Sequence, residues 1–190
     1  MQSLFLLIMP TILDFDELNT LTEASVSLSD SVEEVVDKVE TLLILAYQKG
    51  FDAVEEMLEC DIAYNTASMQ EVIYRKIEGK TFADRVRDHI KNDDLTGLQN
   101  LVANEAHRVA AAAGYDCATN LSRQGVGVVK VWQTMQDPRV RDTHDYIQDD
   151  RVGLTEDFYT YDGDHAPYPG AFGYAENNIG CRCWIIYQRI

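Results

Sequence analysis

The chain has 190 residues, 46% of them hydrophobic and 25% charged, which is typical of a folded globular protein and excludes wholesale disorder. Its formal net charge is −16, and this charge is unevenly spread. Between Asp14 and Asp61 lie 14 of the 32 acidic residues, with only Lys38 and Lys49 to offset them. Nucleic-acid affinity comes chiefly from basic residues that neutralise phosphates. We therefore expect no direct nucleic-acid binding by the acidic amino-terminal half.

The opening segment MQSLFLLIMP is apolar, but it lacks the basic start and the cleavage site of a signal peptide. It is also shorter than the roughly 20 residues that a membrane-spanning helix needs. We interpret it as a strand or docking segment and expect no membrane association. The four cysteines are too few for a disulfide scaffold in a chain of this size, so reduced thiols in a cytoplasmic setting are expected.

Most of the chain up to about residue 121 has the periodicity of helices. Apolar residues recur every three or four positions from Val32 to Leu58, where Asp30 or Ser31 is placed to cap a helix and Gly50 could interrupt it. Further helices are predicted over about 68–77, from Thr81 onward, and over about 95–121. Four consecutive alanines from Ala110 indicate a place where another backbone can approach closely.

The pattern changes after Gly125. Residues 126–132, VGVVKVW, predict a buried strand, and the CWIIYQRI segment predicts a closing strand. Between them we expect a short helix capped by Asp142, and then a long loop packed through Tyr159, Tyr161, Tyr168 and Phe172. The sequence thus predicts an α+β fold with an acidic helical region over 1–95 and a small β-containing domain over 96–190.

Charged residues are concentrated directly after the first predicted strand. Asp137, Arg139, Arg141, Asp142, His144 and Asp145 fall within nine positions. One interpretation is a structural corner in which Asp137 caps a turn and the arginines pair with carboxylates such as Asp142 or Asp149. The other is a set of functional groups displayed at the end of a strand.

Cys181 and Cys183 stand two residues apart in an extended segment, so both sulfurs project to one face. They could bind zinc together with His144, and His165 or Asp137 could then supply the fourth ligand. The alternative is a pair of buried thiols packed in a small core. A Cys-His nucleophile that uses His144, and a general base at His165, are further options.

Three ordered segments, VWQTMQDPRVRDTH, APYPG and GCRCW, together resemble the phage Mu F-like minor head protein family, the head-morphogenesis domain of tailed phages. The resemblance covers about residues 97–190. The family usually follows its histidine with Leu-Asp-Gly, where this chain has Ile147-Gln148-Asp149, and its asparagine usually abuts the first cysteine. The matching residues are Trp132, Thr134, Asp137, Arg139, Arg141, His144, Tyr168, Pro169, Gly170, Cys181, Arg182 and Cys183.

This resemblance implies a virion structural protein rather than an enzyme. Such a protein would be present in few copies, join the portal and other head proteins during assembly in the host cytoplasm, and assist DNA packaging or ejection. Self-association would be compatible with this function. The alternative is a small nuclease or toxin-type effector domain that uses His144 and Arg141, with His165 as a further acid–base group.

Overall fold

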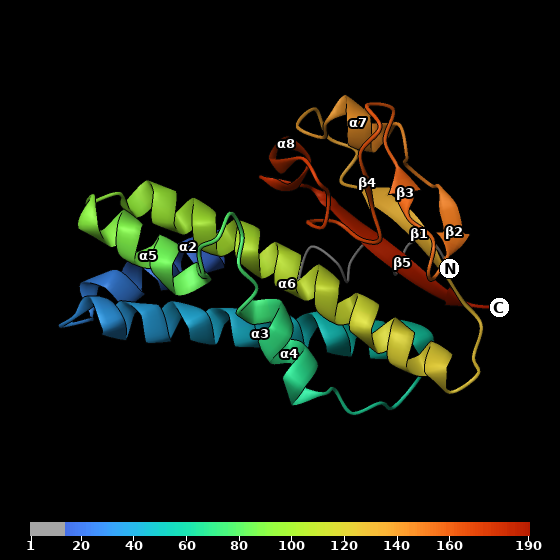
Figure 1. Ribbon diagram of the computed structural model, residues 1–190, viewed down its shortest axis with the longest axis horizontal. Coiled ribbons are helices and arrows are strands. Elements are labelled where there is room, and N and C mark those ends of the chain that lie inside the picture. Colours follow the sequence, from blue (N-terminus) through green and yellow to red (C-terminus); the bar gives the residue numbers. More distant parts are fainter. Residues whose placement is uncertain (1–13) are drawn as a thin grey trace.

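A computed structural model of the chain describes residues 14–190; the predicted opening strand or docking segment lies outside the described residues. The fold is α+β, as the sequence predicts, with a helical amino-terminal part and a small antiparallel sheet (Figure 1). The helices of the first part are α2 (Phe15–Ser27), α3 (Val32–Leu58), α4 (Thr66–Ile73), α5 (Phe82–Lys91) and α6 (Leu95–Arg123).

The carboxy-terminal part is built on a three-stranded antiparallel sheet in the order β2-β1-β5. Thr134 at the end of β1 pairs with Cys183 at the start of β5. A two-stranded ribbon and two short helices lie in the connections. The elements are β1 (Val128–Thr134), α7 (Asp142–Asp145), β2 (Arg151–Gly153), β3 (Phe158–Tyr159), β4 (His165–Ala166), α8 (Ala175–Asn178) and β5 (Cys183–Arg189).

The two long helices α3 and α6 run side by side through the molecule (Figure 1). The α3 helix continues through Gly50 to Leu58, so the predicted interruption at Gly50 is wrong. Gly50 is instead a point where the two helices approach closely, because a Cβ atom built there would lie 2.3 Å from the Ala110 carbonyl oxygen. The close backbone approach predicted at the alanine run is therefore confirmed at Ala110.

Side-chain caps fix where the helices begin. The Ser31 hydroxyl accepts a hydrogen bond from the Glu34 backbone N–H at 3.2 Å, which makes Ser31 the cap of α3. Thr81 and Asp84 form a reciprocal capping box at the start of α5. Asp142 does not cap α7, contrary to the prediction, because Arg141 occupies the cap position and Asp142 is the first helical residue.

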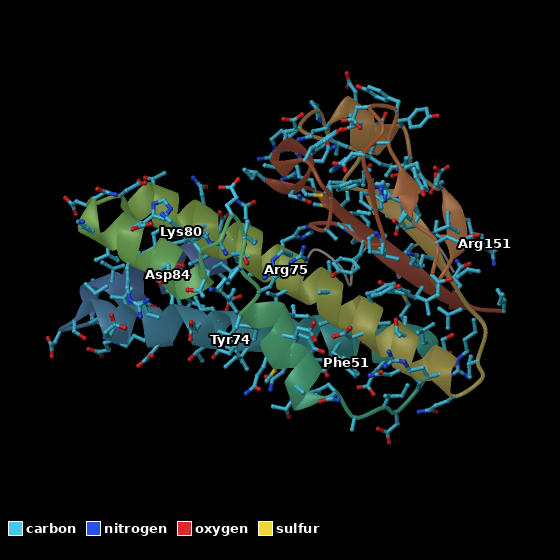
Figure 2. All side chains as sticks on the ribbon, in the orientation of Figure 1. Phe51, Tyr74, Arg75, Lys80, Asp84 and Arg151 are labelled. Atoms are coloured by element: carbon cyan, nitrogen blue, oxygen red, sulfur yellow. The ribbon has the colours of Figure 1, made fainter. Side chains whose placement is uncertain are left out.

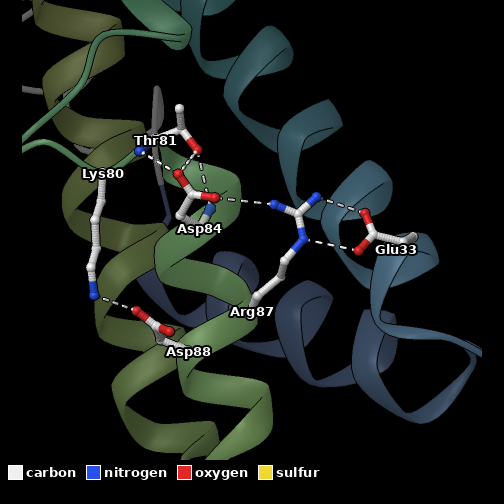
Figure 3. A network of polar contacts seen from close by, with 6 residues as sticks. All are labelled: Glu33, Lys80, Thr81, Asp84, Arg87 and Asp88. Atoms are coloured by element: carbon white, nitrogen blue, oxygen red, sulfur yellow. Dashed lines mark hydrogen bonds and ion pairs between the residues drawn. The ribbon is translucent and has the colours of Figure 1, made fainter.

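A network of ion pairs attaches α5 to the first turn of α3 (Figure 3). The Arg87 guanidinium donates two hydrogen bonds to the Glu33 carboxylate, at 2.9 and 2.7 Å, and lies 3.4 Å from Asp84. Nearby, Lys80 pairs with Asp88 at 2.6 Å. These groups are solvent-exposed, so each pair adds little to stability and mainly fixes the orientation of α5.

A buried charge cluster joins α4, α5 and α6. Glu105 and Arg108 are 4% and 6% exposed, and the Arg108 Nη2 atom donates to the Glu105 carboxylate at 2.8 Å and to the Val72 carbonyl at 3.0 Å. Arg85 donates to the other oxygen of Glu105 at 3.0 Å. Removing one partner of such a cluster leaves an uncompensated buried charge, so these three helices depend on one another.

The sheet is attached to the helices through β5, and β2 forms its outer edge, which carries Arg151 (Figure 2). The Tyr187 backbone N–H lies 3.0 Å from the Met57 sulfur of α3, and Arg189 donates to the Glu59 carbonyl at 3.1 Å. Within residues 14–190, no helix combines the length and apolar composition that crossing a bilayer would require. The division of the chain into 1–95 and 96–190 stays a prediction.

Candidate functional site

His144, Cys181 and Cys183 meet in the interior of the carboxy-terminal part. The His144 Nδ1 atom is 3.6 Å from the Cys181 sulfur and 3.3 Å from the Cys183 sulfur. All three side chains are at most 2% exposed. The sheet explains the encounter, because pairing of Thr134 with Cys183 sets the end of β1 beside the start of β5. The segment after β1 then turns back into α7, and this turn places His144 next to the two sulfurs.

Aromatic rings fix the orientation of the His144 imidazole. Phe172 stacks on it with ring centroids 5.1 Å apart, and the edge of Trp132 contacts it at 5.6 Å. Trp132 also contacts Phe158 and Phe172 at 5.2 and 5.6 Å, so it lies at the centre of this core. An imidazole held on two sides in this way has little freedom to turn, and its Nδ1 atom stays directed at the sulfurs.

The two thiols have different proton affinities. The hydrogen bond from Cys183, together with the nearby His107 and His144, holds the pKa of Cys181 well below its usual range. Burial and the neighbouring Cys181 raise the pKa of the Cys183 thiol. Of the two, Cys181 is therefore the one that ionises first. Neither thiol is solvent-exposed, which distinguishes the pair from the accessible thiolates of reactive cysteines.

The charged corner pairs in part as the sequence-based interpretation predicts. Arg182 donates to both oxygens of Asp137, and the Asp137 carboxylate also accepts from the Arg139 backbone N–H at 2.9 Å. The pKa of Asp137 is lowered, chiefly by the hydrogen bond from Arg182. Arg141 donates to the Ile179 carbonyl. Arg139 pairs with the nearby Asp137 at 3.8 Å, and Asp137 caps the turn, as the structural-corner interpretation predicts. The partners suggested by name, Asp142 and Asp149, are wrong, because Arg139 is held by Asp137 and Arg141 by the Ile179 carbonyl.

Neither residue suggested as a fourth zinc ligand joins the group of His144, Cys181 and Cys183. Asp137 is engaged by Arg182 on the opposite side of the strand from the sulfurs. The His165 ring lies 2.7 Å from the Asp157 carboxylate and is about half exposed. His165 and the buried His144 therefore occupy different environments, which does not favour a shared acid–base function.

The Tyr168-Pro169-Gly170 turn packs on helix α6. The Tyr168 ring lies 5.2 Å from Tyr115, and Gly170, with a φ of 85°, lies so close to Arg108 that an added Cβ atom would be 3.1 Å from its Cα. Only glycine adopts that backbone conformation without strain. Of the four aromatic residues expected to anchor the loop, Tyr159 and Tyr161 are 62% and 59% exposed, so the prediction is wrong for these two.

The centre of the loop is instead a buried carboxylate, that of Asp164. It accepts hydrogen bonds at 2.9 Å from the backbone N–H groups of His165, Gly173 and Tyr174, and from the side-chain amide of Asn177. Burial opposes its ionisation, but these four hydrogen bonds outweigh that effect and lower its pKa. One side chain thus organises both the 164–165 and the 173–177 segments.

We expect Asp164→Asn to lower the free energy of unfolding by about 2–3 kcal/mol at pH 7, because charge-assisted hydrogen bonds of this kind are lost. A folded-state pKa below the unfolded value of about 3.9 means that the carboxylate stabilises the protein fully above that value. This stabilisation is lost as the pH falls through the folded-state pKa. Urea unfolding at several pH values should therefore show the difference between wild type and variant shrinking toward pH 3.

The matched control for this experiment is Asp145→Asn, at an exposed position in α7. It removes the same charge, and we expect a change within about 0.5 kcal/mol at every pH. A difference between wild type and Asp164→Asn that stays constant from pH 7 to pH 3 would show that the buried carboxylate does not supply the stabilisation.

Two structural residues were missed by the sequence analysis. Lys130 lies in the middle of β1 with no exposed surface, and its ammonium group donates to the carbonyls of Glu156 and Pro167 at 2.6 and 2.9 Å. Burial lowers its pKa to about 8. The other is Asp164. A lysine that interrupts an apolar strand was the available signal for the first, whereas a single aspartate in a loop gives none for the second.

The family that this chain matches is a structural phage head family. Comparison of the sequence with models of known protein families matches residues 66–186 to the phage Mu protein F-like proteins. The chain belongs to that family. The matched region includes α4, α5 and α6 as well as the sheet, the charged corner and the paired cysteines.

The chain is also similar to a curated protein, NAD(+)--arginine ADP-ribosyltransferase EFV of Enterococcus faecalis (strain ATCC 700802 / V583). The two are 28% identical over 131 residues, which cover 66% of this chain and 26% of that protein. The chain thus matches about a quarter of the length of this relative. No solved structure gives a significant match.

Proposed function

We propose that this phage head morphogenesis protein is a minor component of the virion that joins the portal during head assembly and assists DNA packaging or ejection. Membership of the phage Mu protein F-like family carries this proposal. The placement of the signature residues supports it, since Trp132, His144, Cys181 and Cys183 are all buried. Residues in such positions hold a fold together, which suits a protein that acts by binding.

The helical part offers surfaces suited to docking on a larger assembly. Leu28 is 74% exposed and Leu45 46% exposed, on or next to the long acidic helix α3. Exposed apolar side chains on a helical part that is acidic overall fit a partner surface that combines apolar pockets with basic residues. The sheet part stays compact beside this extended arm (Figure 1). On this proposal the helices contact the portal and other head proteins.

The test is co-expression of the full chain with the portal protein of the same phage, followed by size-exclusion chromatography and mass spectrometry of purified heads. We expect the two proteins to elute together and the chain to be found in heads at a few copies. A Leu28→Asp/Leu45→Asp variant should fold normally but elute apart from the portal. Heads that lack the chain in every preparation, together with separate elution of the wild-type proteins, would contradict the proposal.

The curated relative is named as an ADP-ribosyltransferase, so an enzymatic alternative is tested in parallel. The purified chain would be incubated with RNA, with DNA, and with NAD as the ADP-ribose donor together with an arginine acceptor. We expect no turnover, because His144 is 1% exposed and Arg141 is bonded to the Ile179 carbonyl. Cleavage or transfer that disappears in His144→Ala would overturn the assignment as a structural protein.

A further inference from the structure

The arrangement of His144 and the two cysteines is not fully satisfied by hydrogen bonds among themselves. Two sulfurs converge on the single Nδ1 atom, at 3.3 and 3.6 Å. A neutral imidazole offers one acceptor nitrogen, which takes one hydrogen bond well. The other ring nitrogen, Nε2, is buried and has no hydrogen-bond partner within residues 14–190. A purely hydrogen-bonded core therefore leaves two sulfurs sharing one acceptor nitrogen and the Nε2 atom unpaired.

The same atoms have the separations that ligands of one zinc ion have. Zinc bonds are about 2.3 Å long to sulfur and about 2.0–2.1 Å to histidine nitrogen, in tetrahedral geometry. Two ligands at those distances stand about 3.6 Å apart from sulfur to nitrogen. The observed distances of 3.6 and 3.3 Å agree with this value to within a few tenths of an ångström. The three ligand atoms all lie within 4.8 Å of one another.

We propose that His144 Nδ1 and the Cys181 and Cys183 sulfurs bind one structural zinc ion, and that His107 completes the four ligands. A site made of two thiolates and imidazole nitrogen binds zinc in preference to magnesium, calcium or manganese, which prefer oxygen ligands. Binding releases the thiol protons to solvent as the two zinc–sulfur bonds form. No oxidation or reduction takes place. This proposal does not depend on the portal-binding function proposed above.

His107 is assigned the fourth position by its place on helix α6. It lies beside Cys181, and its buried Nε2 atom has no hydrogen-bond partner among the residues that the structure describes. It also lines a groove of about 890 Å³ together with Cys181 and Cys183. It lies outside the group whose ligand atoms are all within 4.8 Å of one another, so its side chain must rotate toward the ion. The site would then tie α6 to α7 and β5.

The residues around His144, Cys181 and Cys183 hold these side chains in fixed orientations. Phe172 and Trp132 hold the imidazole of His144, as described above. Arg182, between the two cysteines, points to the other face of the strand and is anchored by Asp137. The Trp132 indole N–H is buried, contacts Cys183 and has no hydrogen-bond acceptor within the described part of the chain. A zinc-bound thiolate would supply that acceptor, since indole nitrogen is a donor only.

The experiment uses the full chain, purified under reducing conditions without chelator, and measures zinc per chain by elemental analysis. We expect about one zinc per chain in the wild type and a loss of at least about tenfold in Cys181→Ser/Cys183→Ser. The matched control is Cys60→Ser/Cys117→Ser, because these thiols also lie next to each other but have no histidine within ligand distance in the described region. The control should keep its zinc.

Cobalt uptake by the folded wild type avoids dependence on a variant that fails to fold. The metal-free chain should bind one Co²⁺ and show a sulfur-to-cobalt charge-transfer band together with the visible bands of tetrahedral cobalt. A wild-type chain with less than about a tenth of a zinc and no such band would overturn the proposal, as would loss of zinc from the Cys60/Cys117 control. Equal rates of zinc loss to a chelator in wild type and His107→Ala would overturn the assignment of His107.

Discussion

Replacing Gly50 by alanine is expected to lower the free energy of unfolding by about 3 kcal/mol or more. The same replacement at an exposed helix position stabilises a protein by about 1 kcal/mol, because alanine is the better helix former. Here the new Cβ atom would lie 2.3 Å from the Ala110 carbonyl oxygen and 2.7 Å from the Ala110 Cα atom. These are backbone atoms that no side-chain rotation can move. The two longest helices would have to separate, which loosens the packing along both.

Chemical denaturation of the wild type and the Gly50→Ala variant measures this effect. Lys49→Ala is the control, because Lys49 is the exposed neighbour in the same helix and the change tests helix propensity without the contact. We expect the control to stay within about 0.5 kcal/mol of the wild type. A Gly50→Ala variant as stable as Lys49→Ala would show that α3 and α6 do not approach as closely as described.

Trp132→Ala is expected to lower the free energy of unfolding by about 4 kcal/mol. Its side chain has no exposed surface and contacts His144, Phe158 and Phe172, so its loss leaves a large cavity in the middle of the small core. The surrounding rings belong to α7, β3 and the loop at Phe172, and these separate segments cannot close the space together. Trp184, which faces the other side of the sheet on β5, provides the control. Trp184→Ala should cost about 1 kcal/mol.

The measurement follows two signals during unfolding, the helical circular dichroism and the near-ultraviolet signal of the aromatic core. If residues 1–95 and 96–190 are separate units, Trp132→Ala should lose the aromatic signal at lower denaturant than the helical signal. Coincident loss of both signals would argue against that division. A stability loss in Trp132→Ala no larger than that in Trp184→Ala would contradict the central place of Trp132 in the core.

Local signals in the sequence were sufficient for most of the elements. The cap at Ser31 and the capping box at Thr81 predicted helix starts because such caps depend only on residues within one turn. The strand boundaries were displaced by two residues, from 126–132 to Val128–Thr134. Gly50 was misread because its reason lies in a different helix, and helix propensity alone carries no information about a neighbouring backbone.

The residues of the candidate site could be predicted from the sequence, but most of their hydrogen-bond partners could not. The ordered signature drew attention to His144, Cys181 and Cys183, and pairing of β1 with β5 brings them into contact. Arg139 pairs with the nearby Asp137, but nothing in the sequence indicated that the fold also supplies Arg182 to Asp137 from 45 residues away. Tyr159 and Tyr161 are exposed although they are aromatic, because the aromatic content of a loop does not tell which of its side chains face the core.

The position of β5 has a consequence for how the protein forms during synthesis. This strand is the last element in the sequence, yet it pairs with β1 along seven residues and also connects the sheet to α3. The helices can pair as soon as they leave the ribosome. Strand β1 cannot form this pairing until β5, about 50 residues later in the chain, has been synthesised. Nascent chains interrupted before Cys181 would therefore expose an apolar strand edge and be prone to aggregate.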